Sequence, residues 1–255
     1  MSELKNSPVL LECKNLLVGY SSALSTMSMP FDFALTAGTV VALMGENGCG
    51  KSSLLKTFAG LLSPVSGEIS LDGKPLVEWL PRERAQEISL VRMSSAVPPR
   101  MSVSEFVRLG RSPYSGIFDS RTDEDKRIVD ESMALLDVAN FANRPIAELS
   151  DGERSRVFLA EAVAQQVKVL LLDEPNAFLD IPRSHALFRL LKKIATERGM
   201  GIIVSTHSVE YAERYCDRIM VVNDGAVRVA DADVARKEGL LDWTEEQLAP
   251  AQRPG

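Results

Sequence analysis

The chain has 255 residues, of which 45% are hydrophobic and 25% are charged, as in an ordinary globular protein. Its net charge of −6 argues against a protein that binds nucleic acid by bulk electrostatics, because neutralising phosphates requires clustered Lys and Arg. The charge still allows a small phosphate-containing ligand, since backbone amides hold phosphates at little cost in net charge.

No run of residues approaches the roughly 20 consecutive apolar residues that span a bilayer. Residues 1–8 are polar and lack the apolar core of a secretory signal. The three cysteines, Cys13, Cys49 and Cys216, are scattered without the paired spacing of metal ligands, and we expect them to be reduced. These features predict a cytoplasmic protein, or one that docks peripherally on a membrane-bound partner.

Short apolar runs alternate with segments of helical periodicity. In chain order, the sequence predicts a strand at 9–11, a strand at 40–44, a helix at 51–62, a strand or hairpin at 66–73, a strand at 88–91, helices at 104–109, 124–136 and 154–166, a strand at 169–172, a helix at 184–198, and strands at 201–205 and 218–222. This alternation predicts an α/β fold in which helices cover a mostly parallel sheet.

The helices between residues 102 and 166 interrupt the alternation like an inserted subdomain. We therefore expect a single domain, residues 1–255, with a core made of 1–91 and 168–240. The helical subdomain would be 92–167, and the polar, proline-containing tail 241–255 is expected to fray.

The most informative motif follows the strand at 40–44. It reads Gly45-Glu46-Asn47-Gly48-Cys49-Gly50-Lys51-Ser52 and fits G-x-x-x-x-G-K-[ST]. Glycines let such a backbone wrap around phosphates, with its amides at the N-terminus of the next helix. Lys51 would reach the β- and γ-phosphates and Ser52 would ligate Mg²⁺. We call Gly45–Ser52 the phosphate loop and predict that it binds ATP together with Ser53; the alternative is an ordinary glycine-rich turn.

An apolar strand, 169–172, ends in the two carboxylates Asp173 and Glu174. A carboxylate at the end of a parallel strand beside a phosphate loop can hold Mg²⁺. The next carboxylate points the other way and can activate the attacking water. We assign Asp173 to the metal and Glu174 to the general base; the alternative is the solvated start of a loop.

Four further features resemble one family, the ATP-binding subunits of ABC transporters. They are Leu149-Ser150-Asp151-Gly152-Glu153, similar to the family's signature L-S-G-G-Q; Leu179-Asp180, similar to the D-loop; His207 in Ser205-Thr206-His207, similar to the switch histidine; and Tyr20, at the place of an aromatic that stacks on adenine. The motifs occur in the family's order, from Tyr20 to about Asp224.

The resemblance implies an ABC-type P-loop fold, with a mostly parallel core, an antiparallel part and an inserted helical subdomain. It also implies ATP hydrolysis, with Glu174, Asp180 and His207 as catalytic residues. Two copies would form a head-to-tail homodimer, each ATP lying between one phosphate loop and the partner's Ser150 and Gly152.

Each of these residues also has a purely structural interpretation. Ser150 and Glu153 fit a capping box at the start of the following helix. His207 could be a satisfied residue at a strand end, and Tyr20 could pack on the sheet edge.

The sequence departs from the family pattern at three positions. The family's glutamine after the strand at 88–91 corresponds to Met93, and a thioether is a poor ligand for Mg²⁺. Gln86 lies before the strand, so Ser94 or Ser95 could substitute through water, and we expect water to complete the metal shell. Asp151 replaces the first glycine of the signature, near the γ-phosphate, and must point away or be screened. Glu153 replaces the signature's glutamine, whereas Ser150 and Gly152, which would provide the hydroxyl and the backbone amide, are intact.

Within the family, Gly110-Arg111-Ser112-Pro113-Tyr114 and Leu179-Asp180-Ile181 resemble the importers of ferric siderophores, haem or cobalamin. This implies membrane-spanning permease subunits, an external substrate-binding protein and a position on the cytoplasmic face of the membrane. The alternative for 110–114 is a simple helix stop and turn. An exporter and a slow, regulatory cassette remain as alternative functions. A DNA-repair ATPase would need heptads or paired cysteines, which the sequence lacks. A translation factor of this family would need a second phosphate loop, which is also missing.

Overall fold

The computed structural model describes residues 7–19, 27–93, 97–115 and 122–241. Tyr20, Ser94, Ser95 and the predicted tail beyond Leu241 lie outside the described residues.

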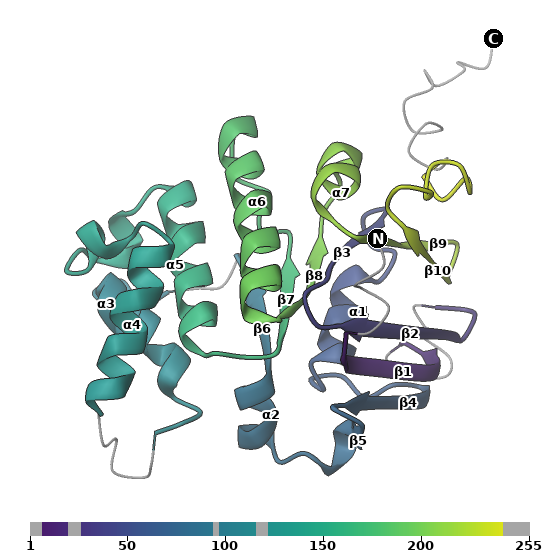
Figure 1. Ribbon diagram of the computed structural model, residues 1–255, viewed down its shortest axis with the longest axis horizontal. Helices are drawn as coiled ribbons and strands as arrows, with labels where there is room; N and C mark the ends of the chain where they lie inside the picture. The colour runs from purple at the N-terminus through teal and green to yellow at the C-terminus, as the bar shows by residue number, and fades with distance from the viewer. Residues whose placement is uncertain (1–6, 20–26, 94–96, 116–121, 242–255) are drawn as a thin grey trace.

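Strands and helices alternate along most of the chain (Figure 1). They are β1 (Val9–Leu17), β2 (Phe31–Thr36), β3 (Val40–Gly45), α1 (Lys51–Phe58), β4 (Ser66–Leu71), β5 (Lys74–Pro75), α2 (Pro81–Glu87), β6 (Ile88–Arg92), α3 (Val103–Arg108), α4 (Asp123–Leu135), α5 (Asp151–Ala164), β7 (Val169–Asp173), α6 (Ile181–Arg198), β8 (Gly201–Ser205), α7 (Val209–Tyr215), β9 (Arg218–Asn223) and β10 (Ala226–Asp231). Short 3₁₀ helices occur at η2 (Leu76–Glu78), η3 (Leu109–Arg111), η4 (Ala139–Phe141) and η5 (Ile146–Glu148).

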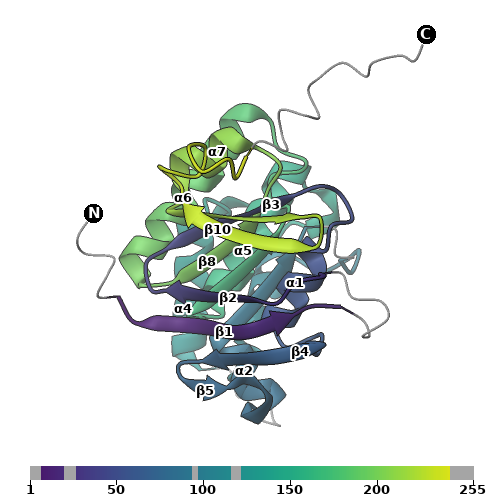
Figure 2. The same ribbon diagram turned by 90° about the vertical axis from the view of Figure 1, so that its right-hand side faces the viewer.

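The strands form two sheets. The larger has the order β10-β9-β3-β8-β7-β6, and its strands run parallel except for β10, which pairs antiparallel with β9. The smaller sheet, β2-β1-β4-β5, is antiparallel and lies in front in Figure 2. The predicted mostly parallel core with an antiparallel part is confirmed.

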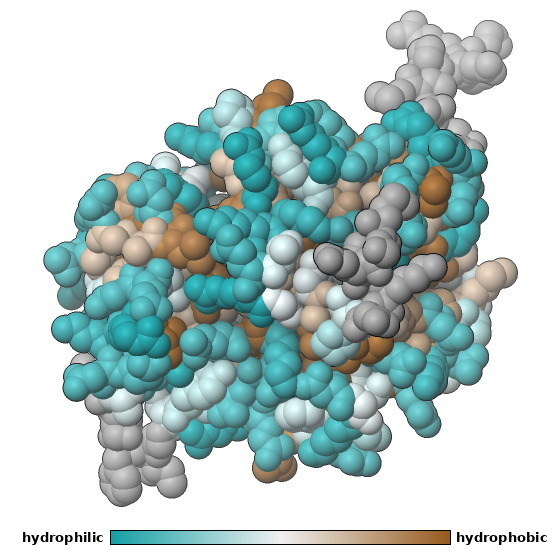
Figure 3. Space-filling view, in the orientation of Figure 1, coloured by the Kyte–Doolittle hydropathy of each residue, from teal (hydrophilic) through white to brown (hydrophobic). Residues whose placement is uncertain are grey.

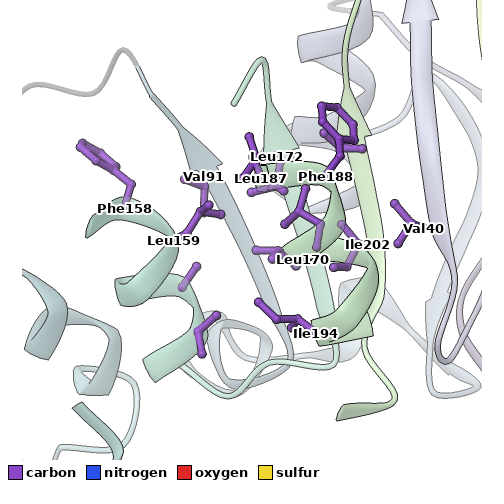
Figure 4. Close-up of a cluster of buried hydrophobic side chains, with 14 of the residues drawn as sticks. Val40, Val91, Phe158, Leu159, Leu170, Leu172, Leu187, Phe188, Ile194 and Ile202 are labelled. Carbon is purple, nitrogen blue, oxygen red and sulfur yellow. The ribbon is translucent and has the colours of Figure 1, made fainter. Parts of the chain in front are cut away.

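Alternate residues of a strand point to opposite sides of its sheet, and in the large sheet the residues on both sides are buried. In β3, Val40, Ala42 and Met44 join one hydrophobic cluster, while Val41 and Leu43 join the other. The first cluster packs the sheet against α5 and α6, whose side chains meet those of β6, β7 and β8 in Figure 4. The second lies between the sheet, α1 and the antiparallel strands.

The sequence analysis missed β2, β10, α2 and α7. Strand β2 alternates between buried and more exposed residues, and β10 buries only Ala230, so neither is a continuous apolar run. Helices α2 and α7 have seven residues each, too short for a clear helical period.

Helices α3, α4 and α5 pack together on the left of Figure 1. The rings of Phe106 in α3 and Phe158 in α5 lie 4.9 Å apart. Nearby, Arg111 is buried; it donates to Asp125 Oδ1 at 2.8 Å, and its guanidinium lies 4.0 Å from the centre of the Tyr114 ring. Segment 110–114 therefore has a structural role, holding α4 against the end of α5.

Of the helices in the described ranges, none is both long and apolar enough to cross a membrane. The face shown in Figure 3 is mostly hydrophilic, with hydrophobic side chains in scattered groups.

Candidate nucleotide site

The phosphate loop joins β3 to α1, as predicted. Gly45, the last residue of β3, has φ 145°, and a Cβ atom there would lie 2.3 Å from the carbonyl oxygen of Val222 and 2.7 Å from Cys49 Sγ. No other residue type fits this position, because both the backbone and the available space exclude a side chain. The chain then turns so that α1 begins at Lys51, with its N-terminus at the loop.

Lys51 lies inside the loop. Its side chain is buried, and Nζ donates to the carbonyl oxygens of Gly45 and Glu46, each at 2.8 Å. An ammonium group held there places a positive charge within the loop, as phosphate binding requires. Ser52 is exposed, whereas the adjacent Ser53 is buried. Cys49 is half-buried, and burial raises the pKa of its thiol, which keeps it protonated at neutral pH.

The carboxylates at the end of β7 are oriented by a residue that the sequence analysis did not assign. The hydroxyl of Ser205, at the end of the neighbouring strand β8, donates to Asp173 Oδ1 at 3.0 Å and accepts from the Glu174 N–H at 2.7 Å. Ser205 is fully buried. The only sequence signal was its place directly before Thr206-His207, at the end of a predicted strand.

Glu174 and His207 meet at this edge of the sheet. Glu174 leaves the strand with φ 51°, a conformation that non-glycine residues rarely adopt outside functional or tightly constrained sites. Its Oε1 lies 3.0 Å from His207 Nε2, and both side chains are half-exposed in a shallow pocket also lined by Asn176, Thr206 and Ser208. The N–H of Thr206 donates to the Leu43 carbonyl at 3.1 Å, which places this pair beside the strand that leads into the phosphate loop.

The signature residues start α5. Ser150 is its N-cap residue and forms a reciprocal capping box with Glu153, so the structural interpretation of this pair is correct. Asp151 is ion-paired with Arg154, one turn further along the helix. This ion pair partly offsets the negative charge of the Asp151 carboxylate.

The signature also packs against the D-loop of the same chain. A Cβ atom on Gly152 would lie 3.3 Å from Arg183 Cδ and 3.5 Å from Leu179 Cδ2. Asp180 caps α6 by accepting from the Arg183 N–H at 2.8 Å, and its side chain is exposed. Its other carboxylate oxygen lies 3.4 Å from Arg183 Nη1, so the described contacts of Asp180 within one subunit are a helix cap and an ion pair, both with Arg183.

Met93 follows β6 directly, and Arg92 before it is paired with Asp173 in the parallel ladder. The position is thus level with the edge of the sheet where Asp173 and Glu174 lie, but Met93 is only 8% exposed and its side chain belongs to the large hydrophobic cluster. Gln86 is engaged elsewhere, because its amide donates to the Pro113 carbonyl at 2.8 Å.

The oxygens of Ser52 and Asp173 suit Mg²⁺, which prefers hard oxygen ligands. Among the residues placed by the structure, no group of three or more His, Cys, Asp or Glu could hold a metal ion by itself. Mg²⁺ in nucleotide sites needs only one or two protein groups, because phosphates and waters complete its shell. The donor set therefore fits this ion.

Comparisons with known proteins agree with this site. Residues 29–177, more than half of the chain, match the ABC transporter family. The hemin import ATP-binding protein HmuV of Nocardia farcinica is 39% identical over 196 residues, which cover 77% of this chain and 67% of that protein.

Two solved structures are similar over nearly the whole chain. A putative metal-chelate type ABC transporter in an inward-facing conformation superposes with a TM-score of 0.81 at 25% identity, covering 93% of this chain and 89% of that one. The dimeric ABC transporter cassette MJ0796 superposes with a TM-score of 0.77 at 26% identity, covering 88% and 99%. The chain belongs to the ABC transporter family, as an ATPase subunit that hydrolyses ATP.

Proposed function

We propose that this ATPase drives the import of an iron complex, such as haem or a ferric siderophore, or of cobalamin. ATP hydrolysis as the energy source for this import is supported by the Glu174–His207 pair, which Ser205 holds beside the phosphate loop. The import part is supported by the likeness to a hemin import subunit and to a metal-chelate type transporter.

In this proposal Lys51 and the loop amides bind the β- and γ-phosphates of ATP, and Tyr20 stacks on the adenine. Glu174 takes the proton of the attacking water, and His207, within hydrogen-bond distance of that carboxylate, orients it and contacts the γ-phosphate. Mg²⁺, held by Ser52 and Asp173, would neutralise charge that develops on the phosphates.

The second copy of the chain would complete the site. Ser150 and the Gly152 amide at the start of α5 would meet the partner's γ-phosphate, where a helix N-terminus favours negative charge. Asp180 would lie at the same interface, and a dimeric relative supports this arrangement. ATP then holds two subunits together, and hydrolysis releases them.

The permease subunits would bind on the helical side, which we propose as a subdomain of residues 92–167. A groove there combines apolar side chains with basic and acidic ones. Its lining includes Pro98, Met101, Arg108, Leu109, Ser112 and Lys126. Such a surface suits a short segment of a membrane protein, which would place the ATPase on the cytoplasmic face of the membrane and couple it, through the permease, to an external binding protein.

The first test is steady-state ATP hydrolysis across a range of protein concentrations, with Glu174→Gln as the inactive control. A rate that rises more than linearly with concentration supports a dimeric ATPase.

The second test is uptake of haem, a ferric siderophore and cobalamin by vesicles that contain the copurified permease. ATP-dependent movement in the outward direction would favour the exporter, and no movement of any of the three would reject the proposed substrate class.

A further inference from the structure

The signature of this chain contains a carboxylate, Glu153, that is hydrogen-bonded to Ser150. Glu153 Oε2 accepts two hydrogen bonds from Ser150, one from the backbone N–H at 2.9 Å and one from the hydroxyl at 2.8 Å. In return, the Glu153 N–H donates to Ser150 Oγ at 3.4 Å. The serine side chain is therefore used in both directions, as donor and as acceptor.

The single proton of the Ser150 hydroxyl is committed in this arrangement. The hydrogen bonds from Ser150 lower the pKa of the Glu153 carboxyl, so it is ionised at neutral pH and acts only as an acceptor. The hydroxyl must be the donor. A γ-phosphate oxygen is also an acceptor, and a serine hydroxyl has one proton to give. Ser150 cannot donate to Glu153 and to the partner's ATP at the same time.

We propose that Glu153 is a positioning residue that holds the Ser150 hydroxyl proton in the free subunit and must release it before Ser150 can bind the ATP of a second subunit. The inference rests on the proposed head-to-tail dimer and deepens it, because it names what opposes closure. A neutral glutamine would hold the proton less tightly, since charge-assisted hydrogen bonds are about twice as strong as neutral ones. Its amide oxygen would still accept from the Ser150 N–H and preserve the cap.

The chain contains a matched control. Helix α3 begins with the same capping box: Glu105 Oε2 accepts from the Ser102 N–H at 2.8 Å and from the Ser102 hydroxyl at 2.7 Å. The Glu105 N–H donates to Ser102 Oγ at 3.3 Å. This box lies outside the signature, so Glu105→Gln makes the same change to a helix cap without touching the proposed ATP contact.

The experiment measures the monomer–dimer equilibrium by sedimentation velocity in saturating ATP and Mg²⁺, on the full chain carrying Glu174→Gln to prevent turnover. Glu153→Gln should tighten the dimer about 100-fold, which is about tenfold for each of the two equivalent Ser150–Glu153 pairs in a head-to-tail dimer, because one charge-assisted hydrogen bond is weakened in each pair. Glu105→Gln should leave the dimer constant unchanged, with a similar small change in melting temperature. An unchanged constant for Glu153→Gln would overturn the inference.

Removing a charge near a phosphate could also tighten the dimer by reducing repulsion, and a double-mutant cycle separates the two causes. If Glu153 acts through the hydroxyl, the gain in dimer affinity disappears when Ser150 is replaced by Ala; a gain that persists overturns the inference.

If Ser150→Ala abolishes dimerisation, the salt dependence of the dimer constant distinguishes the two causes. A gain that survives 0.5 M NaCl supports direct competition for the proton, whereas one that vanishes identifies screened repulsion and overturns the inference.

The proposed dimer can fail separately. If the Glu174→Gln chain shows no dimer with ATP, with or without Glu153→Gln, the head-to-tail arrangement itself is wrong and the inference falls with it. A clear ATP-dependent dimer that ignores Glu153→Gln rejects the inference alone.

Discussion

Ser205 and Asp173 are joined side chain to side chain across the neighbouring strands β8 and β7, with the serine hydroxyl donating to the carboxylate at 3.0 Å. The same oxygen accepts from the N–H of Glu174. One buried hydroxyl therefore fixes both the residue proposed to hold Mg²⁺ and the residue proposed as the base.

Replacing Ser205 by Ala removes a hydrogen bond to a charged group, a loss of about 1.5–3 kcal/mol. We expect the turnover number to fall by about 10- to 100-fold and the Mg²⁺ concentration at half-maximal rate to rise. Ser205→Thr keeps the hydroxyl and should recover most of the rate. Mg²⁺ titrations of ATP hydrolysis for the three proteins make the comparison, and a Thr variant as slow as the Ala variant would contradict this role.

His207→Ala should reduce the turnover number by about 100-fold or more, the range for loss of a positioned hydrogen-bond donor, because the variant loses both the contact that orients Glu174 and the proposed contact with the γ-phosphate. The chain's other histidine, His185, provides the control. Its Nδ1 lies 3.0 Å from the Tyr215 hydroxyl, and its ring packs edge-on against the ring of Tyr211. Both contacts are structural. His185→Ala should lower the melting temperature and leave hydrolysis nearly unchanged at room temperature; equal losses of rate in the two variants would argue against a catalytic His207.

Met93→Gln has two expected effects. Burying an amide in the hydrophobic cluster should destabilise the fold by about 1–3 kcal/mol, measured by urea unfolding, whereas Met93→Leu should cost less. We also expect the Mg²⁺ dependence of turnover to change, because position 93 directly follows the residue paired with Asp173 and a glutamine turned out of the cluster would offer an oxygen ligand. Identical Mg²⁺ titrations for the Met93→Gln variant and the unmodified protein would show that this position does not reach the metal.

Glu161 in α5 gives a pH-dependent prediction. Burial raises the pKa of its carboxyl from 4.5 to about 7. Between these values the folded state binds the proton and the unfolded state does not, so the contribution of this group to stability is fully present below pH 4.5 and is lost as the pH rises through 7. Glu161→Gln should therefore stabilise the fold by about 1–3 kcal/mol at about pH 8 and by much less at about pH 5. The difference in unfolding free energy between the two proteins at each pH isolates this group, and a constant difference would contradict the prediction.

Local pattern was enough to predict the main elements and the order of the motifs. The strand leading into the phosphate loop and the strand ending at Asp173 are continuous apolar runs, because the large sheet is buried on both faces. The glycines of the loop mark backbone conformations that other residues rarely adopt. These signals are carried by neighbouring residues, so they can be read from the sequence.

The tertiary structure decided which distant residues meet. Ser205 follows Asp173 by 32 positions, and only the pairing of β7 with β8 brings its hydroxyl to the carboxylate. The burial of Met93 likewise depends on helices packed from other parts of the chain. The neighbouring residues in the sequence are the same whether Ser205 contacts a carboxylate or solvent, and whether Met93 is buried or exposed. The role of each side chain follows from the atoms that surround it, and the packing of the whole chain determines which atoms these are.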